Sequence, residues 1–224
     1  MKCEEKVGYI GTYKRVIDFI NRSKSLNIPI VVRTTIFKTN IQKIRSMIRD
    51  LSKYGVNIFN LRSVLPKGLA LHKYEEICHS VNEYFKLIKR KQEYWWDRGV
   101  FVYSEDPITI PYQKHLLDLI KQLRQEHLMM FCGAGVEVFY VDVKGVLYPC
   151  AYIDDPIGHI DVINEDHLIS FKLKMQALRG KSMCRLCPYW DLCRGGCKAV
   201  AFQLFKDPLM GDPRCLRVKN LGMR

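Results

Sequence analysis

The sequence has no long hydrophobic run and no secretory signal. Its longest apolar stretches, such as residues 136–143, are too short and too interrupted by polar residues to cross a bilayer, and the N-terminal segment lacks the apolar core of a signal peptide. These absences predict a cytoplasmic protein without a membrane partner. In that reducing compartment, we expect the nine cysteines of the 224-residue chain to bind metal or carry out redox chemistry before they form disulfides.

Acidic residues are scarce, since 36 Lys and Arg stand against 23 Asp and Glu and the net charge is +13. Residues 1–131 hold +10 of this charge and residues 132–224 hold +3. A basic surface can serve solubility alone, or it can attract an anionic partner. Because the sequence has no basic motif interleaved with aromatic residues and no helix-turn-helix pattern, nucleic acid is not the expected partner.

Apolar residues in the first half of the chain alternate between two periodicities. Helical spacing occurs at residues 13–26, 41–51, 77–88 and 112–127, and β-branched runs typical of buried strands occur at residues 28–37, 56–64 and 99–103. Asn40 is expected to cap the second of these helices. Helices between successive strands predict a parallel sheet, so the fold class is α/β. Only about three such units precede Cys132, which is too few for a closed eight-stranded barrel.

The second half of the sequence has a different pattern of apolar residues. Residues 136–150 alternate around Lys144-Gly145, which predicts a β-hairpin, and a short helix is expected near residues 166–178. The pattern divides the chain into three predicted parts: an α/β part at residues 1–110, a bridging helix at residues 111–131, and a cysteine-rich domain at residues 132–224.

Seven of the nine cysteines follow residue 131, and four of them lie in CRLCPYWDLCRGGC, residues 184–197. A structural zinc site takes four ligands and favours paired Cys-x-x-Cys motifs, so seven thiols with this spacing would leave three over. Iron–sulfur clusters take thiolates from irregular loops, and Gly195 and Gly196 allow the backbone to approach such a cluster closely. These residues favour iron and sulfur, with zinc and disulfides as the alternatives.

The order of the cysteines resembles the signature of SPASM domains, which are C-terminal extensions of radical S-adenosylmethionine enzymes that modify peptides, proteins and haem precursors. The resemblance rests on Cys132-x12-Gly145-x4-Cys150, on Cys184-x2-Cys187-x5-Cys193-x3-Cys197, on IGHI at residues 157–160, and on GDPRC ending at Cys215. Residues 8–110 look more loosely like the second half of a radical S-adenosylmethionine barrel. The resemblance implies an incomplete TIM-like barrel followed by a small SPASM domain with a β-hairpin and short helices.

The resemblance also implies ligands for two auxiliary [4Fe–4S] clusters. The outer cluster would be bound by Cys184, Cys187, Cys193 and Cys215, and the inner cluster by Cys132, Cys150 and Cys197. Three thiolates leave one inner position open, and Glu126 and His127 occupy the stretch from which some family members supply a fourth cysteine. Barrels of this kind bind ligands at the carboxyl ends of their strands, which here carry candidate cofactor-binding residues: Arg33, Thr35, Arg62 and Ser63.

One sequence motif of the family is missing. Radical S-adenosylmethionine enzymes hold a third cluster by Cys-x3-Cys-x2-Cys, and this sequence has no such motif. Cleavage of S-adenosylmethionine is therefore expected only if an N-terminal half or a partner chain completes the protein; otherwise the chain is a degenerate relative. The clusters would relay electrons from an external donor, or anchor a peptide, protein or tetrapyrrole-like substrate. The alternatives are a non-catalytic zinc-binding module and a stand-alone electron carrier.

Overall fold

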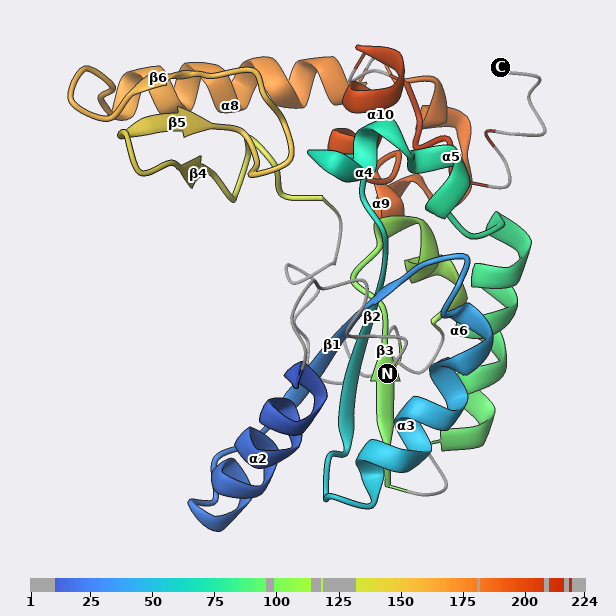
Figure 1. The fold of residues 1–224 in the computed structure, drawn as a ribbon. Coiled ribbons are helices and arrows are strands. Elements are labelled where there is room, and N and C mark those ends of the chain that lie inside the picture. The colour runs from blue at the N-terminus through green and yellow to red at the C-terminus, as the bar shows by residue number, and fades with distance from the viewer. Residues whose placement is uncertain are drawn as a thin grey trace.

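A computed structural model describes residues 11–95, 99–113, 118, 132–180, 182–207, 210–215 and 218 (Figure 1). Its first half is built around a parallel sheet, and its second half carries a small antiparallel sheet. The predicted α/β class is therefore confirmed. Within the described ranges, none of the helices is long and apolar enough to cross a membrane.

The parallel sheet has three strands in the order β1-β2-β3, and no closed barrel is formed by the described residues. The elements of this half are α2 (Thr12–Ser25), β1 (Val31–Ile36), a 3-10 turn (Ile41–Lys43), α3 (Ile44–Ser52), β2 (Ile58–Ser63), α4 (Leu69–His72), α5 (Tyr74–Ile77), α6 (Val81–Trp95), β3 (Phe101–Tyr103) and a second 3-10 helix, η3 (Pro107–Tyr112). All three strands lie within the runs predicted from the sequence.

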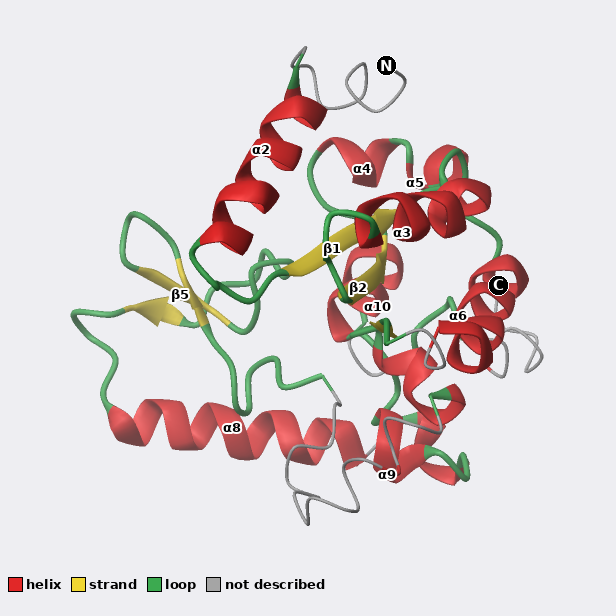
Figure 2. Ribbon diagram, turned by 90° about the horizontal axis from the view of Figure 1, so that it is seen from below, coloured by secondary structure: helices red, strands yellow, loops and turns green. Residues whose placement is uncertain are grey.

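The core of this half lies between the sheet and helices α3 and α6, which cover one of its faces (Figures 1 and 2). Alternate strand residues point into this core, including Ile36, Phe59, Leu61 and Val102. Helix α3 contributes its predicted apolar stripe, with Ile44, Ile48 and Leu51 buried. The intervening strand residues therefore lie on the opposite face.

Two local predictions are wrong. Asn40 makes no capping hydrogen bond to the helix that follows it, because its side chain instead accepts from the Phe37 N–H and donates to the Thr35 carbonyl, bracing the end of β1. The long helix expected from residue 77 is interrupted, and α6 begins only at Val81. Ser80 and Glu83 form a capping box there. The Ser80 hydroxyl lies 2.8 Å from the Glu83 carboxylate, and it accepts from the Glu83 backbone N–H at 3.1 Å.

The second half contains the antiparallel sheet β4-β5-β6 and the cysteine-bearing loops. Its elements are β4 (Tyr140–Val141), β5 (Val146–Tyr148), β6 (Gly158–His159), α8 (Glu165–Gly180), a 3-10 turn, η5 (Met183–Leu186), α9 (Trp190–Cys193) and α10 (Lys198–Phe205). The predicted hairpin is confirmed, and Asp142 closes its turn by accepting from the Lys144 and Val146 N–H groups. The helix predicted near residues 166–178 is confirmed as α8, although its 16 residues make it longer than the short helices expected for this domain.

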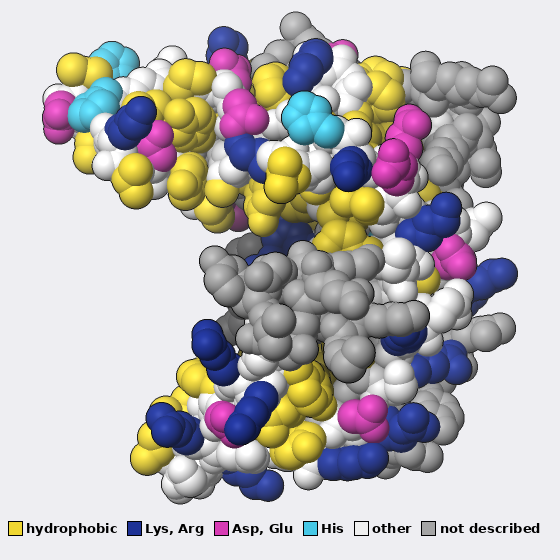
Figure 3. Space-filling model, in the orientation of Figure 1, with side chains coloured by type: hydrophobic (Ala, Val, Ile, Leu, Met, Phe, Trp, Pro, Cys, Tyr) yellow, Lys and Arg dark blue, Asp and Glu magenta, His cyan; other side chains and the backbone are white. Residues whose placement is uncertain are grey.

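The sheet of β4–β6 and helix α8 form an arm that projects from the rest of the molecule (Figure 1). Apolar side chains gather on the visible face of this arm, whereas Lys and Arg are prominent around the lower body (Figure 3). The predicted bridging helix at residues 111–131 lies almost entirely outside the described residues, as do Glu126 and His127.

Candidate metal centre

Four cysteines from three separate loops line one cavity of about 660 Å³. Cys184 and Cys187 come from the 3-10 turn η5 and its end, Cys193 ends α9, and Cys215 follows the loop that begins at Gly211. The cavity thus brings together the four thiols for which the resemblance to SPASM domains implies an outer cluster.

The rest of the cavity wall is mainly apolar and aromatic. It includes Ile108 and Tyr112 from η3, together with Leu186, Pro188, Tyr189 and Trp190 from the cysteine loop. The Tyr112 and Tyr189 rings lie 6.2 Å apart, so aromatic contacts from both halves of the chain close this side. Such a wall limits the access of water, which is one of the ways in which proteins tune an iron–sulfur centre.

The backbone between Cys193 and Cys197 turns through three successive residues with positive φ: Arg194, Gly195 and Gly196. A Cβ on Gly196 would lie 2.3 Å from the Asp212 Cβ and 2.9 Å from the Ile108 Cγ2, so a glycine is required there. Both glycines thus adopt a backbone conformation that glycine favours, and the expected approach of this backbone to a cluster stays a prediction. The turn allows Cys193 and Cys197 to belong to different groups of thiols.

The remaining three cysteines form a second group. Cys150 and Cys197 pack in one apolar cluster with Leu65, Ile153 and Val200. Burial and, to a smaller extent, the neighbouring Cys132 thiol raise the pKa of Cys197 to about 12. Burial also raises the pKa of Cys150, again with a contribution from Cys132. Cys132 is therefore an electrostatic neighbour of both other members.

The outer thiols influence one another in the same way. Burial raises the pKa of Cys193 to about 12, with further contributions from Asp212, Cys215 and Cys184. Burial also raises the pKa of Cys184, which the Lys198 ammonium lowers and Cys215 and Cys187 raise. Thiols with raised pKa values are protonated at neutral pH, so a metal that binds them as thiolates releases protons and supplies the missing positive charge.

The cavity offers four soft thiols as donors, and soft thiolates are the ligands that iron–sulfur clusters prefer. A cubane of four irons and four sulfides takes its ligands around a space, whereas a tetrahedral zinc ion takes its four ligands at one point. In the described part of the chain, no three His, Cys, Asp or Glu side chains are grouped as a site for one metal ion.

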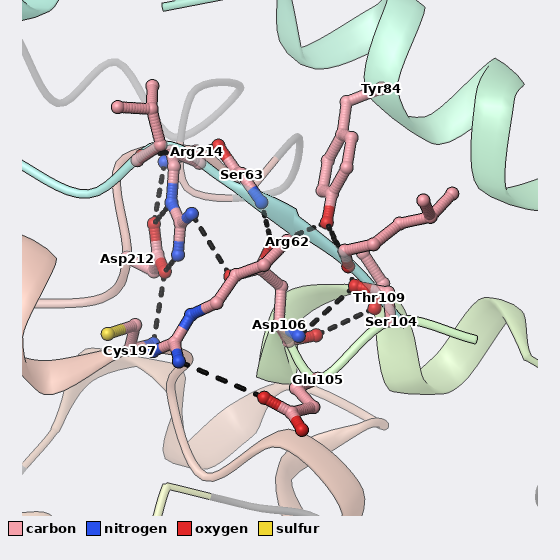
Figure 4. Close-up of polar contacts among 12 residues, drawn as sticks. Arg62, Ser63, Tyr84, Ser104, Glu105, Asp106, Thr109, Cys197, Asp212 and Arg214 are labelled. Atoms are coloured by element: carbon pink, nitrogen blue, oxygen red, sulfur yellow. Dashed lines mark hydrogen bonds and ion pairs between the residues drawn. The ribbon is translucent and has the colours of Figure 1, made fainter. Parts of the chain in front are cut away.

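A buried ion network joins the sheet to the two groups of cysteines (Figure 4). The Arg214 guanidinium, only 5% exposed, donates to both carboxylate oxygens of Asp212 at 3.0 and 2.8 Å and to Asp106 at 3.2 Å. Asp106 follows β3 and also accepts from the Tyr84 hydroxyl and from the Ser63 N–H. Residues 108 positions apart in the sequence therefore share one buried network.

Asp212 holds both groups of cysteines. Its carboxylate accepts from the Cys197 N–H at 3.0 Å, and its carbonyl oxygen accepts from the Cys215 N–H at 2.9 Å. Its own N–H donates to the Gly195 carbonyl oxygen. In the sequence, GDPRC stands out only as part of a cysteine pattern, and nothing there reveals this role of Asp212 and Arg214, which flank Pro213 directly before Cys215.

The candidate cofactor-binding residues at the strand ends are only partly brought together. Glu105 lies 2.8 Å from the Arg33 guanidinium and 3.8 Å from that of Arg62, and Thr35 pairs with Arg62 across the strands. Arg62 also lies over the Tyr152 ring, 5.4 Å from its centroid. Ser63 lies apart from these residues, because it is buried and its hydroxyl contacts the His79 Nε2 at 2.8 Å.

Comparison with known proteins identifies relatives of this chain. The chain is 24% identical over 156 residues to the sporulation killing factor maturation protein SkfB of Bacillus subtilis, and 23% identical over 223 residues to the AdoMet-dependent heme synthase of Methanosarcina barkeri. The chain has radical S-adenosylmethionine (SPASM-type) relatives. These matches cover 68% and 93% of the chain but only 34% and 62% of the two relatives. No protein-family model matches the chain.

Solved structures of radical S-adenosylmethionine enzymes share the fold. The anSMEcpe structure with bound AdoMet superimposes with a TM-score of 0.64 at 16% identity, covering 93% of this chain and 57% of that one. SuiB of Streptococcus suis, bound to S-adenosylmethionine, gives a TM-score of 0.61 at 14% identity and is covered over 48% of its length. The chain thus spans roughly half of each of these SPASM-type structures.

Proposed function

We propose that the chain is the auxiliary-cluster half of a radical S-adenosylmethionine enzyme of the SPASM type. The observation that carries this proposal is the convergence of Cys184, Cys187, Cys193 and Cys215 on one apolar cavity, apart from the group around Cys197. The four would bind an outer [4Fe–4S] cluster. Cys132, Cys150 and Cys197 would bind an inner one. Such clusters supply one-electron transfer when bound.

The open sheet supports the proposal that a further segment or partner chain completes the protein. Among the described residues, β1 is an edge strand with no partner on its outer side, and the sheet face away from α3 and α6 carries Arg33 and Arg62. An exposed parallel edge is a template for further strands. We propose that residues 1–110 are the second part of a barrel, that residues 111–131 bridge to the domain at residues 132–224, and that the absent part holds the cluster that cleaves S-adenosylmethionine.

Arg33, Thr35 and Arg62 are proposed to face the cofactor in the completed protein. Thr35 and Arg62 lie near the carboxyl ends of β1 and β2, whereas Arg33 lies in the middle of β1 and not at the expected strand end. The two guanidinium groups suit an anionic group such as a carboxylate. Ser63 is not proposed to contact the cofactor, because its hydroxyl is engaged by His79 on the helix-covered face of the sheet.

The proposed substrate class is a peptide or protein. One relative is a maturation protein for a sporulation killing factor, and anSMEcpe was solved with the Kp18Cys peptide. The basic character of residues 1–131 suits an acidic peptide. The similarity to an AdoMet-dependent heme synthase makes a tetrapyrrole-like precursor the second candidate.

Metal analysis of cysteine variants tests the proposal. Anaerobically reconstituted protein is expected to be brown, to absorb broadly near 400 nm and to contain about eight irons per chain. Cys187→Ser is expected to remove the outer cluster and Cys150→Ser the inner one, leaving about four irons each.

Cys78→Ser is the matched control, because Cys78 neither lines the cavity nor packs in the apolar cluster of Cys150 and Cys197. Its iron content is expected to equal that of the wild type. A colourless protein that binds one or two zinc ions, or equal iron loss in all three variants, would contradict the proposal.

A further inference from the structure

Part of the wall of the outer cavity is an exposed apolar surface. Leu186, which precedes Cys187, is 94% exposed, and Met183, which precedes Cys184, is 39% exposed. Pro188 is exposed as well. All three side chains line the cavity, and we call them the η5 rim. Two of the proposed cluster ligands are therefore sequence neighbours of apolar side chains that reach solvent.

The segment that carries the η5 rim is strongly basic. Residues 180–224 contain nine Lys and Arg against three Asp, a net charge of +6, whereas residues 132–179 contain four Lys and Arg against seven acids, a net charge of −3. An oxidised outer cluster bound by four thiolates would add only about −2. Arg185 is exposed in the same 3-10 turn as Leu186. An acidic partner is therefore attracted to the cysteine-bearing loops more than to the arm.

The η5 rim lies away from the open edge of the parallel sheet. In Figure 2, α9, whose residues Trp190 and Cys193 line the same cavity, lies at the lower margin of the molecule. Helix α2, which precedes the edge strand β1, lies at the upper margin (Figure 2). A segment that pairs with β1 therefore adds to a different part of the molecule from the one that holds the rim.

These features suit a partner that exchanges electrons and then leaves. Electron-transfer complexes are weak and bury less than about 1,200 Å² in total, so a few exposed apolar side chains provide enough contact. Opposite charges on the two partners speed their encounter without making the complex long-lived. The proposed outer cluster would lie directly behind such a contact, because the rim side chains and the four thiols line one cavity.

We propose that the η5 rim is the docking site of a small acidic one-electron carrier that reduces the outer cluster. This inference rests on the proposed function and deepens it, by naming the class of external donor and the surface that receives it. The carrier loses one electron, the oxidised cluster gains that electron, and no bond forms or breaks. Leu186 provides the apolar contact, and Arg185 attracts the acidic surface of the carrier.

The test uses flavodoxin, a small acidic flavin protein, as the carrier and the reconstituted full chain with Cys150→Ser, which leaves the outer cluster alone. Calorimetry measures binding of oxidised flavodoxin, which transfers no electron, and stopped-flow absorbance measures reduction of the cluster by fully reduced flavodoxin. Arg185→Glu is expected to slow this reduction about tenfold at low ionic strength and to weaken its salt dependence, because a rim charge acts mainly on association. Leu186→Ser is expected to raise the Kd about fivefold.

Two variants in the arm are matched controls. Lys172→Glu makes the same reversal of charge at an exposed position of α8, and Leu173→Ser removes a leucine that is 59% exposed. Both are expected to keep the Kd and the rate of the unsubstituted protein. Reduction by dithionite in high salt needs no docking site and is expected to be equal in all variants, which separates a lost contact from an altered cluster.

The outcomes distinguish this inference from the proposed function. Unchanged rates and affinities in both Arg185→Glu and Leu186→Ser overturn the docking site, and so do equal losses in the two arm variants. If one rim variant loses its outer irons, the binding of oxidised flavodoxin to the other rim variant decides. A chain that holds its irons but neither binds flavodoxin nor is reduced by it overturns the inference and leaves the cluster assignment standing. A wild-type chain that binds no iron overturns the proposed function itself.

Discussion

His79 is a buried histidine held in its neutral form. It is 4% exposed, its Nδ1 lies 3.1 Å from the Ser80 carbonyl oxygen and its Nε2 lies 2.8 Å from the Ser63 hydroxyl. The Nδ1–H donates to the carbonyl, so Nε2 accepts from Ser63. Burial lowers the pKa of His79, because desolvation penalises the imidazolium.

This lowered pKa makes the protein less stable in acid. Between the lowered pKa in the folded chain and about 6.5 in the unfolded chain, the unfolded state binds more protons. Stability is therefore expected to fall as the pH falls below about 6.5. His79→Asn is expected to reduce this loss, which urea unfolding of the reduced, metal-free chain at pH 7.5 and 5.5 would measure.

The matched control is His72→Asn, because His72 is an exposed histidine close by in the sequence. It is expected to leave the wild-type difference between the two pH values unchanged. The assignment to His79 fails if His79→Asn loses as much stability in acid as the wild type does.

At the scale of elements, the turn between α9 and α10 depends on glycine. Gly196 has φ of +80°, and a Cβ there would overlap the Asp212 Cβ and the Ile108 Cγ2. Gly196→Ala is expected to cost about 1–3 kcal/mol for the backbone and a similar amount for the overlap. It is also expected to reduce iron binding, because Cys197 directly follows the turn.

Gly11→Ala separates these two costs. Gly11 has φ of +85° but no atom within 4 Å of an added Cβ, so only the backbone cost is expected. Urea unfolding and iron content of the two variants check the prediction. Equal losses of stability in both would mean that the contact between Gly196 and Asp212 does not restrict the turn.

The elements of the first half were predictable because they follow simple periodicities. The strands β1, β2 and β3 fall within β-branched runs, and α3 buries the stripe that its spacing predicts. The errors arose where side chains had alternative partners. Asn40 braces β1 instead of capping the next helix, and the Ser80-x-x-Glu83 capping box, visible in the sequence, was overlooked at the start of α6.

The cysteines of the candidate site were predictable from the sequence, whereas the ion network around them was not. The spacing of the cysteines indicated a metal-binding domain, and the resemblance to SPASM domains implied the division into two groups. The ion network of Asp106, Asp212 and Arg214 left no such pattern, because its pairing depends on how the end of β3 meets the loop before Cys215.

At the scale of the whole molecule, Arg214 links the sheet to the cysteine-bearing loops. Its guanidinium binds Asp106, which follows β3, and Asp212, which lies in the loop before Cys215. All three side chains are almost fully buried. Burial raises the cost of separating these charges, so the two halves are expected to unfold together. Circular dichroism reports the helices throughout, and in a background that carries Trp95→Phe and Trp96→Phe the fluorescence of Trp190 reports the cysteine loop.

Arg214→Met is expected to break this coupling. It leaves two buried carboxylates without their cation, which costs about 3–5 kcal/mol, and it removes the ionic link between the halves. The urea unfolding curves from circular dichroism and fluorescence are expected to coincide in the metal-free wild type and to separate in this variant. Arg194→Met is the control, because Arg194 pairs with the exposed Asp191 and its loss is expected to cost about 0–1 kcal/mol. Coincident curves in Arg214→Met would mean that apolar contacts, such as those of Ile108 in the cavity wall, hold the halves together without the ion network.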